Sequence, residues 1–266
     1  MSKRNKTVKK NENCDILKVD NMDKFEKHTD NGICQKHPLL PKHPFRMIIC
    51  GSSGCGKSNL LLSLIKDKLV FDKLHIYSKH LDQGKYQYIK DFYETQDGLI
   101  KDKYGIDFKT IEHFENNLDN MVECSDLNKS YKNLIIVDDF PLPNAKEKKI
   151  IDELFTSCRH KNTSIIFIGQ MYFRISRNIR LNLSHLCIFQ NNNNKELMML
   201  HTELGCDMNL REFRKLYNGI LCEKYKFISI FNEDPPETKY RDNFEVFDIE
   251  KIKNKPKKDK KDKTDD

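Results

Sequence analysis

The 266-residue chain has the length of one α/β domain or of two small ones. Hydrophobic residues make up 38% of it and charged residues 33%, a composition typical of a water-soluble domain with a modest core. No apolar run approaches the roughly 18 residues that a membrane-spanning helix requires. The basic N-terminus lacks the apolar stretch of a secretory signal. These features argue against a membrane protein and against a secreted one.

The net charge of +7 is concentrated at the two ends of the chain. Residues 1–10 carry five basic side chains and no acidic one, and residues 251–266 carry eight lysines against four aspartates. Such arms either bind nucleic-acid phosphates or remain solvated and disordered. Nine cysteines without a C-x-x-C pair indicate reduced thiols and a reducing compartment. Cys34 and His37 lie close in sequence, but no second ligand pair at zinc-finger spacing follows them.

The first strong pattern is a strand, a glycine-rich turn and a helix. Residues 1–36 read as a basic, disordered extension, and the Pro-rich segment 37–44 leads into a short apolar strand at 47–50. The sequence GSSGCGKS (51–58) then fits G-x-x-x-x-G-K-[ST], and the apolar segment 60–65 reads as the helix that the motif requires. This arrangement is a P-loop in its proper context, which predicts binding of ATP.

The residue types of the P-loop suit phosphate chemistry. Glycines let backbone N–H groups converge on phosphate oxygens, and the following helix adds the positive end of its dipole. Lys57 supplies a charge for the β- and γ-phosphates, and the Ser58 hydroxyl is a ligand for Mg²⁺. The residues expected to contact nucleotide are Gly51, Ser52, Ser53, Gly54, Cys55, Gly56, Lys57, Ser58 and Asn59.

Residues 73–78 read as a second strand, and residues 79–131 as a long, polar, mostly helical region. Aromatic and apolar side chains would form one face of that region, and we interpret them as packing residues, with base stacking as the alternative. They are Tyr86, Tyr88, Ile89, Phe92 and Tyr93.

A second strong pattern is the run NLIIVDDF at 133–140. Four consecutive apolar residues predict a strand buried on both faces, as in a parallel sheet. After a P-loop, this is a Walker B strand: Asp138 would hold Mg²⁺ and Asp139 would polarise the attacking water. The alternative is that the two aspartates only form a turn at the end of the strand.

The remaining elements complete an α/β domain. An amphipathic helix is expected within 143–160, a buried strand at 164–170 ending in Gln170, and a further strand at 185–189. Two short helices follow at 195–204 and 209–217, then an added strand at 225–231 and a polar loop at 233–242. We therefore predict one P-loop domain over residues 37–245 and a Lys/Asp-rich, disordered tail over residues 246–266.

Together these motifs resemble the FtsK–HerA superfamily of P-loop ATPases, and within it the poxvirus-type genome-packaging ATPases of large DNA viruses and virophages. The resemblance rests on GSSGCGKS (51–58), LIIVDDF (134–140) and SCRHKNTSIIFIGQ (157–170), continued by MYFRISRNIRLN (171–182). It implies a mostly parallel sheet with helices on both faces and an additional strand between the P-loop strand and the Walker B strand.

By the same resemblance, Asp139 stands at the position of the catalytic acid, Gln170 at that of the phosphate-sensing polar residue, and Arg159 at that of an arginine finger acting on a neighbouring subunit. Arg174, Arg177 and Arg180 are rivals for this last role. The resemblance also implies a homo-oligomeric ring that hydrolyses ATP with Mg²⁺ and moves double-stranded DNA irrespective of sequence. A capsid vertex or portal protein is a further candidate partner, and the host cytoplasm (viral factory) or the virion is the expected location.

Three other interpretations remain at this stage. A motor or helicase of the same superfamily that is not dedicated to packaging would carry the same motifs. A small-molecule kinase also uses a P-loop, although the carboxylate pair and the Gln-ended strand favour water as the nucleophile. A P-loop switch or scaffold would bind nucleotide without moving DNA. A terminase with its own nuclease is not supported, because only 76 residues follow Gln190.

Overall fold

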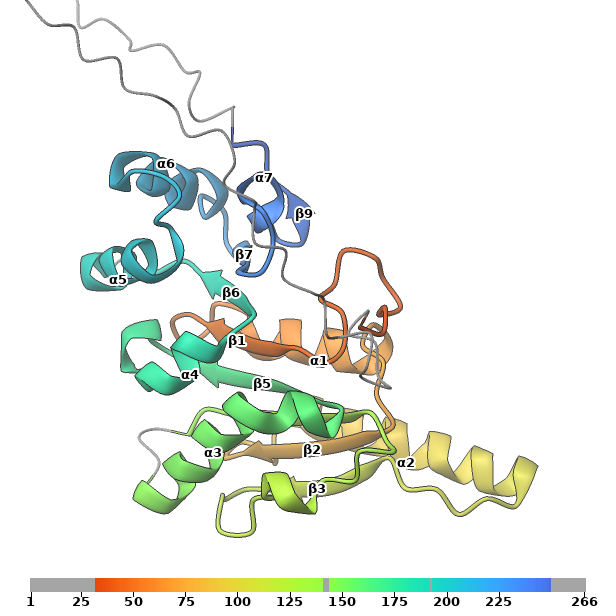
Figure 1. Cartoon of the computed structure of the whole chain (residues 1–266). Coiled ribbons are helices and arrows are strands. Elements are labelled where there is room, and N and C mark those ends of the chain that lie inside the picture. Colours follow the sequence, from red (N-terminus) through yellow and green to blue (C-terminus); the bar gives the residue numbers. More distant parts are fainter. Residues whose placement is uncertain (1–31, 141–143, 192, 250–266) are drawn as a thin grey trace, which may run out of the picture. The chain divides into compact units, whose positions relative to one another are not determined.

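A nine-stranded sheet forms the centre of the described chain, in the order β3-β2-β4-β5-β1-β6-β7-β8-β9 (Figure 1). The computed structural model describes residues 32–140, 144–191 and 193–249. The neighbouring strands from β3 to β6 pair in parallel, and the last three strands pair antiparallel. The strands are β1 (Arg46–Cys50), β2 (Lys73–Ser78), β3 (Ile111–Glu115), β4 (Asn133–Asp138), β5 (Thr163–Gly169), β6 (His185–Phe189), β7 (Phe227–Phe231), β8 (Tyr240–Asp242) and β9 (Glu245–Val246).

The strand β5 lies between β1 and β4 and pairs in parallel with both. Ile166 is in register with Met47 of β1 on one side and with Ile136 of β4 on the other. The predicted additional strand between the P-loop strand and the Walker B strand is therefore confirmed.

Seven α-helices surround the sheet in the described ranges. Asn144 and Asn209 each precede a helix and form a capping box. In each box the asparagine side chain accepts a bond from the backbone N–H of a glutamate three residues later, and the glutamate side chain accepts one from the backbone N–H of the asparagine. These local signals explain why the helices expected near 143–160 and 209–217 form. The helices are α1 (Lys57–Asp67), α2 (Gly84–Tyr104), α3 (Ala145–Ser157), α4 (Arg177–Asn182), α5 (Asn194–Leu204), α6 (Leu210–Ile220) and α7 (Pro236–Lys239).

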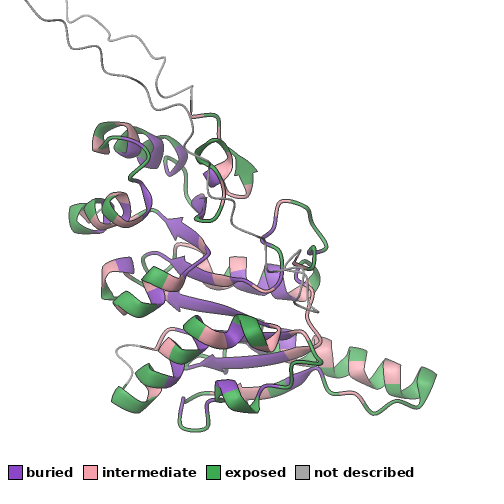
Figure 2. Cartoon of the chain, viewed as in Figure 1, coloured by how far each residue is buried: buried purple, intermediate pink, exposed green. Residues whose placement is uncertain are grey.

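Helices cover both faces of the sheet, as predicted. Alternate residues of β4 belong to different core clusters: Ile136 packs in the cluster that holds α1 and α2, and Val137 in the cluster that holds α3, α5 and α6. The strands are buried between partly exposed helices (Figure 2). A strand buried on both faces must be apolar throughout, which is why LIIV reads as a continuous run.

Two predictions of local structure were wrong. The helix α2 ends at Tyr104, because Gly105 adopts a left-handed conformation (φ 68°), and the edge strand β3 follows within the region expected to be mostly helical. The expected polar loop at 233–242 contains α7 and β8, which pairs with β7. The edge strand β3 and the three-residue strand β8, which lies between β7 and β9, are short and carry polar residues, so neither has the continuous apolar pattern by which a strand is recognised.

The aromatic face of α2 is mainly a packing surface. Tyr86 and Ile89 are buried, whereas Tyr88 is 51% exposed. The interpretation as packing is confirmed for the buried pair.

Backbone pairing in the described chain extends beyond the expected domain limits of 37 and 245. Ile33 bridges to His43, and Val246 pairs with Arg241. The rest of the predicted extension, residues 1–31, and residues 250–266 of the predicted tail lie outside the described residues. Within the described ranges, no helix is both long and apolar enough to cross a membrane.

Glu196 is a buried carboxylate between the P-loop strand and the helices behind it. Its side chain is 0% exposed, and its Oε1 accepts a bond from the backbone N–H of Tyr172 (2.8 Å) and from the Cys50 thiol (3.7 Å). Its Oε2 has no hydrogen-bond partner. Burial raises the pKa of Glu196, because the charged form is poorly solvated there.

We expect Glu196→Gln to raise the Tm at pH 8, because the neutral amide removes the cost of a buried charge. A carboxyl group with a raised folded-state pKa stabilises the fold below its unfolded pKa of about 4.3 and loses that contribution as the pH rises. The gap in Tm between variant and wild type should therefore widen from pH 5 to pH 8 in thermal unfolding. Exposed Glu153→Gln is the control; an equal gap for both variants at every pH would contradict the argument.

Candidate functional site

The P-loop is a tight turn between β1 and α1 that only glycine can form at three positions. Gly54 and Gly56 have positive φ angles of 75° and 111°. A Cβ atom on Gly51 would lie 2.6 Å from Cβ of Phe189 and 2.8 Å from Sγ of Cys55. The turn therefore keeps its backbone close to β6, and Gly51 N–H donates to the Gly169 carbonyl of β5 (3.3 Å).

Lys57 folds back over the loop that it follows. Its Nζ donates to the Gly51 carbonyl at 2.7 Å and to the Ser52 carbonyl at 2.9 Å. The ammonium group is thus held against the first two residues of the turn, close to the N-terminus of α1. A charge in this position, beside the helix N-terminus, suits phosphate oxygens.

Asp138, the last residue of β4, is a buried carboxylate held by two hydroxyl groups. The Tyr86 hydroxyl donates to its Oδ2, and the Ser78 hydroxyl does so at 3.5 Å. Burial raises the pKa of Asp138, with a smaller contribution in the same direction from Asp139. Asp138 and the Ser58 hydroxyl line one cavity, and such oxygen donors fit a Mg²⁺ ion.

Asp139 is held from both sides in a left-handed conformation (φ 56°). Its Oδ1 accepts from Gln170 Nε2 at 3.0 Å, and its Oδ2 lies 3.1 Å from His80 Nε2. Its backbone N–H donates to the Ile168 carbonyl of β5 (3.4 Å). The structure thus brings together the predicted acid and the predicted sensor, and adds a histidine that follows β2.

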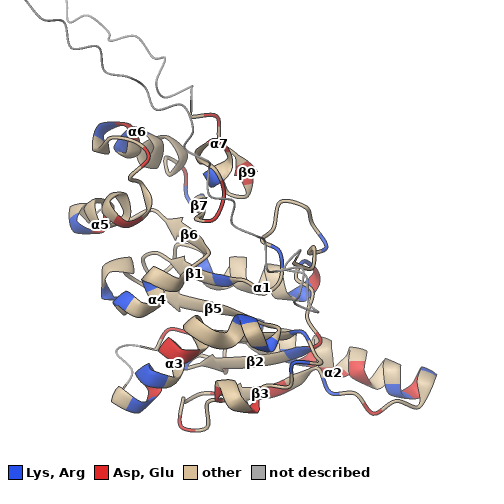
Figure 3. Ribbon diagram, viewed as in Figure 1, with Lys and Arg blue, Asp and Glu red and all other residues tan. Residues whose placement is uncertain are grey.

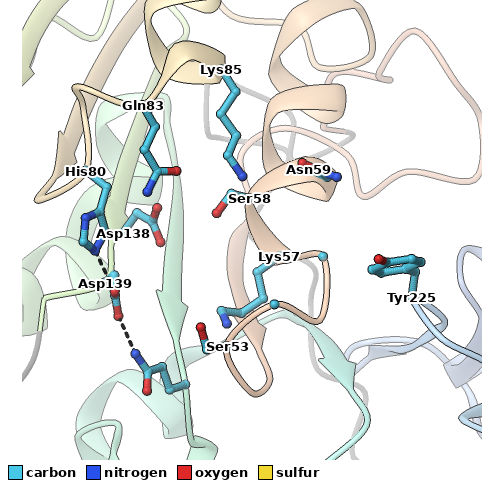
Figure 4. A pocket seen from close by; sticks show the side chains of 13 residues that line it. Ser53, Lys57, Ser58, Asn59, His80, Gln83, Lys85, Asp138, Asp139 and Tyr225 are labelled. Atoms are coloured by element: carbon cyan, nitrogen blue, oxygen red, sulfur yellow. Dashed lines mark hydrogen bonds and ion pairs between the residues drawn. The ribbon is translucent and has the colours of Figure 1, made fainter.

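The predicted residues meet in one open cavity of about 330 Å³ (Figure 4). Gly51, Ser52 and Cys55 do not line it, and Gly51 and Cys55 pack against each other beneath the turn. Four lining residues carry no sequence motif, so sequence reasoning missed them: His80, Gln83, Lys85 and Tyr225. Only the strand order, which puts the ends of β2 and β4 next to each other, could have indicated the first three.

The candidate arginines lie in different places. Arg159 is exposed and precedes β5, at the opposite end of that strand from Gln170, a separation of about 20 Å for a strand of this length. Arg174 and Arg177 follow β5 and are exposed near the carboxyl ends of the parallel strands, where the P-loop also lies. Arg180 is largely buried and pairs with Glu203 at 2.9 Å. Arg159 is therefore remote from the cavity of its own chain.

We expect Lys57→Ala to weaken the affinity for ATP about 10-fold or more, because charge-assisted bonds to phosphate are lost. Equilibrium binding of a fluorescent ATP analogue, with and without Mg²⁺, measures the change. Lys90→Ala on α2 is the matched control, since it removes an equal charge from a residue that does not line the cavity. Unchanged affinity in a folded Lys57→Ala protein would contradict phosphate binding at the P-loop.

Comparison with known proteins finds viral proteins named DNA packaging protein OPG160. The DNA packaging protein OPG160 of Variola virus is 33% identical over 158 residues, which cover 56% of this chain and 54% of that protein. The protein of the same name from Monkeypox virus is 33% identical over 159 residues, which cover 56% of this chain and 49% of that protein. The chain thus spans about half the length of the curated relatives it matches.

A solved structure shares the fold. The genome packaging NTPase B204 from Sulfolobus turreted icosahedral virus 2, in complex with AMP, matches with a TM-score of 0.50 and 13% identity, covering 77% of this chain and 98% of that one. Residues 35–259 also match the family model described as Poxvirus A32 protein. The resemblance inferred from the motifs is thereby confirmed. Because this match extends from before the first strand to beyond the last, the chain belongs to the Poxvirus A32 protein family.

Proposed function

We propose that the chain is an ATP-hydrolysing motor that moves double-stranded DNA, and that it packages a viral genome into a capsid. The observation that carries the proposal is the juxtaposition, in one cavity, of the P-loop, the buried Asp138 and the Asp139–Gln170 pair. The names of the relatives, DNA packaging protein and genome packaging NTPase, support the choice of DNA as the substrate.

In the proposed mechanism, the triphosphate lies on the P-loop and the helix N-terminus, where Lys57 turns from its own loop carbonyls to the phosphate oxygens. Asp139 accepts a proton from the water that attacks the γ-phosphorus, while the bond to the bridging oxygen breaks and ADP leaves. Gln170 and His80 orient Asp139 from opposite sides. Each carboxylate oxygen makes one of these contacts and keeps a second lone pair, with which it can accept a bond from the water.

The donor set also fits Mg²⁺, which would neutralise charge on the triphosphate. Ser58 and Asp138 would hold the ion. The hydroxyl groups of Tyr86 and Ser78 fix the orientation of the Asp138 carboxylate, in the way that outer partners orient metal ligands.

Exposed basic side chains near the catalytic edge support contact with DNA phosphates. Lys and Arg residues lie on α3, α4, α5 and α6 (Figure 3). In particular, Lys146, Arg177 and Lys195 are exposed in the first turns of the helices that follow β4, β5 and β6. Such contacts carry no base information, so the proposed binding is independent of sequence and weakens with salt.

A ring is the proposed assembly, because a head-to-tail contact in which each subunit supplies an arginine to the next makes a cyclic oligomer when it closes. Arg159 is the proposed finger because it stands at the finger position of the family that the chain resembles, and it lies at a distance from the cavity of its own chain. Arg174 and Arg177 are the alternatives. A capsid vertex or portal protein is the further partner proposed, in the host cytoplasm or the virion.

The first experiment is steady-state ATPase activity with and without duplex DNA of unrelated sequences. We expect strong stimulation by every duplex, which declines steeply between 50 and 200 mM salt. Asp139→Asn should bind ATP with unchanged affinity while kcat falls about 100-fold or more, because the proton acceptor is lost.

Asp102→Asn on α2 is the matched control for this substitution, since Asp102 is exposed and does not line the cavity. Hydrolysis that is indifferent to DNA would reject the motor. Normal turnover of Asp139→Asn would move the proton acceptor to another residue.

Mixed assemblies identify the arginine finger. Arg159→Ala should retain ATP binding, and inactive variant subunits should lower the activity of wild-type neighbours, because a finger acting in trans contributes about 10³–10⁵ in rate. Arg174→Ala and Arg177→Ala are titrated into wild type in parallel. If Arg159→Ala mixtures show the plain average of two independent activities, Arg159 is not the finger.

A further inference from the structure

Tyr225 lies at the end of the cavity that is farthest from the catalytic carboxylates. It precedes β7, whose antiparallel pairing with β6 brings Phe227 opposite Phe189 and so returns the chain to the P-loop edge of the sheet. A Cβ atom on Gly56 would lie 3.3 Å from Cδ1 of Tyr225, so the ring borders the P-loop itself. In Figure 4, Tyr225 and the Asp138–Asp139 pair lie on opposite sides of the start of α1.

The backbone of Tyr225 is in a conformation that a tyrosine rarely adopts. Four non-glycine residues in the described ranges have positive φ angles, and Asp139, Asn162 and Asn243 are of the types that tolerate it. Tyr225, at φ 70°, is the exception. Strain of this kind persists where the surrounding structure imposes it, and it concentrates at ligand sites.

The side chain gains little burial from this strain. Tyr225 is 58% exposed, and its ring faces the exposed Lys224, whose Nζ lies 4.9 Å from the ring centroid. An aromatic residue that packs a core would be buried, as its neighbour Phe227 is. The conformation therefore presents a ring to the cavity.

The order of groups along the cavity fixes the direction of a bound nucleoside triphosphate. The carboxylates and Gln170 define the end where the γ-phosphate reacts, and the P-loop with Lys57 holds the phosphates in the middle. The nucleoside must then leave the loop on the other side, where Tyr225 stands. We propose that Tyr225 is the stacking platform for the nucleotide base.

An aromatic platform would favour purines over pyrimidines without forming hydrogen bonds to the edges of the base. Every base has a π-face, and a larger ring system overlaps more of the tyrosine. The expected specificity is therefore ATP and GTP ahead of CTP and UTP.

The inference rests on the proposed function, in that it requires triphosphate binding at the P-loop. Its test compares ATP with inorganic tripolyphosphate, which has the phosphates but no base. Tyr225→Ala should raise KM for ATP about 10-fold, with kcat little changed. Inhibition by tripolyphosphate should stay the same, and Tyr225→Phe should restore the KM. Tyr104→Ala, at the exposed end of α2, is the control.

Tyr225→Gly separates base stacking from a structural role. Glycine adopts positive φ without strain, so this variant should unfold at a Tm no lower than that of Tyr225→Ala, while KM for ATP rises equally. If Tyr225 instead braces the P-loop, inhibition by tripolyphosphate weakens together with ATP binding, and the proposal is overturned.

The remaining outcomes distinguish a failure of the proposed function from a failure of the stacking proposal. Wild-type protein that binds neither ATP nor tripolyphosphate rejects the proposed function itself. Wild-type protein that binds both, with the same KM for ATP in all Tyr225 variants, overturns only the stacking platform.

Discussion

Parallel pairing of β5 with both β1 and β4 is the constraint on which the cavity depends. The carboxyl ends of parallel strands meet at one edge of a sheet, so the residues that follow these three strands come together although they are far apart in sequence. The backbone of β5 binds both neighbours at that edge: the Gly169 carbonyl accepts from Gly51, and the Ile168 carbonyl accepts from Asp139. The glycine-rich turn and Asp139, the proposed proton acceptor, are therefore fixed relative to each other by one strand, which Gln170 directly follows.

The two carboxylates at the end of β4 have different surroundings, and these suit different roles. Asp138 is buried and receives hydroxyl groups, which is the environment of an oriented ligand. Asp139 lies nearer to solvent and contacts the amide of Gln170 and the imidazole of His80. Water can replace these two groups at the carboxylate, and they can then donate to phosphate oxygens. One strand end thus offers a fixed acid and an adjacent acid whose partners can change during a reaction cycle.

Polar groups beneath the cavity connect the strand ends that carry the P-loop to the helices behind the sheet. Glu196 of α5 joins the end of β1 to the segment after β5, since it accepts from Cys50 and from the backbone of Tyr172. A buried carboxylate with an unpaired oxygen is costly, and apolar residues would fill the same space at lower cost. Arg174 lies in the segment after β5. Through Glu196, a movement of this segment would displace the end of the P-loop strand.

The sequence by itself determined the P-loop, the strand with Asp138 and Asp139, and the strand ending in Gln170, because continuous apolar runs and glycine spacing are local signals. It also indicated the additional strand, although only through resemblance to a family. The edge strand β3 and the short strand β8 were not predicted, since both are short and carry polar residues that give no continuous apolar pattern. His80, Lys85 and Tyr225 belong to the cavity only because strand order and the antiparallel return of β7 carry them there. Their contribution depends on long-range pairing, which no local pattern of residues encodes.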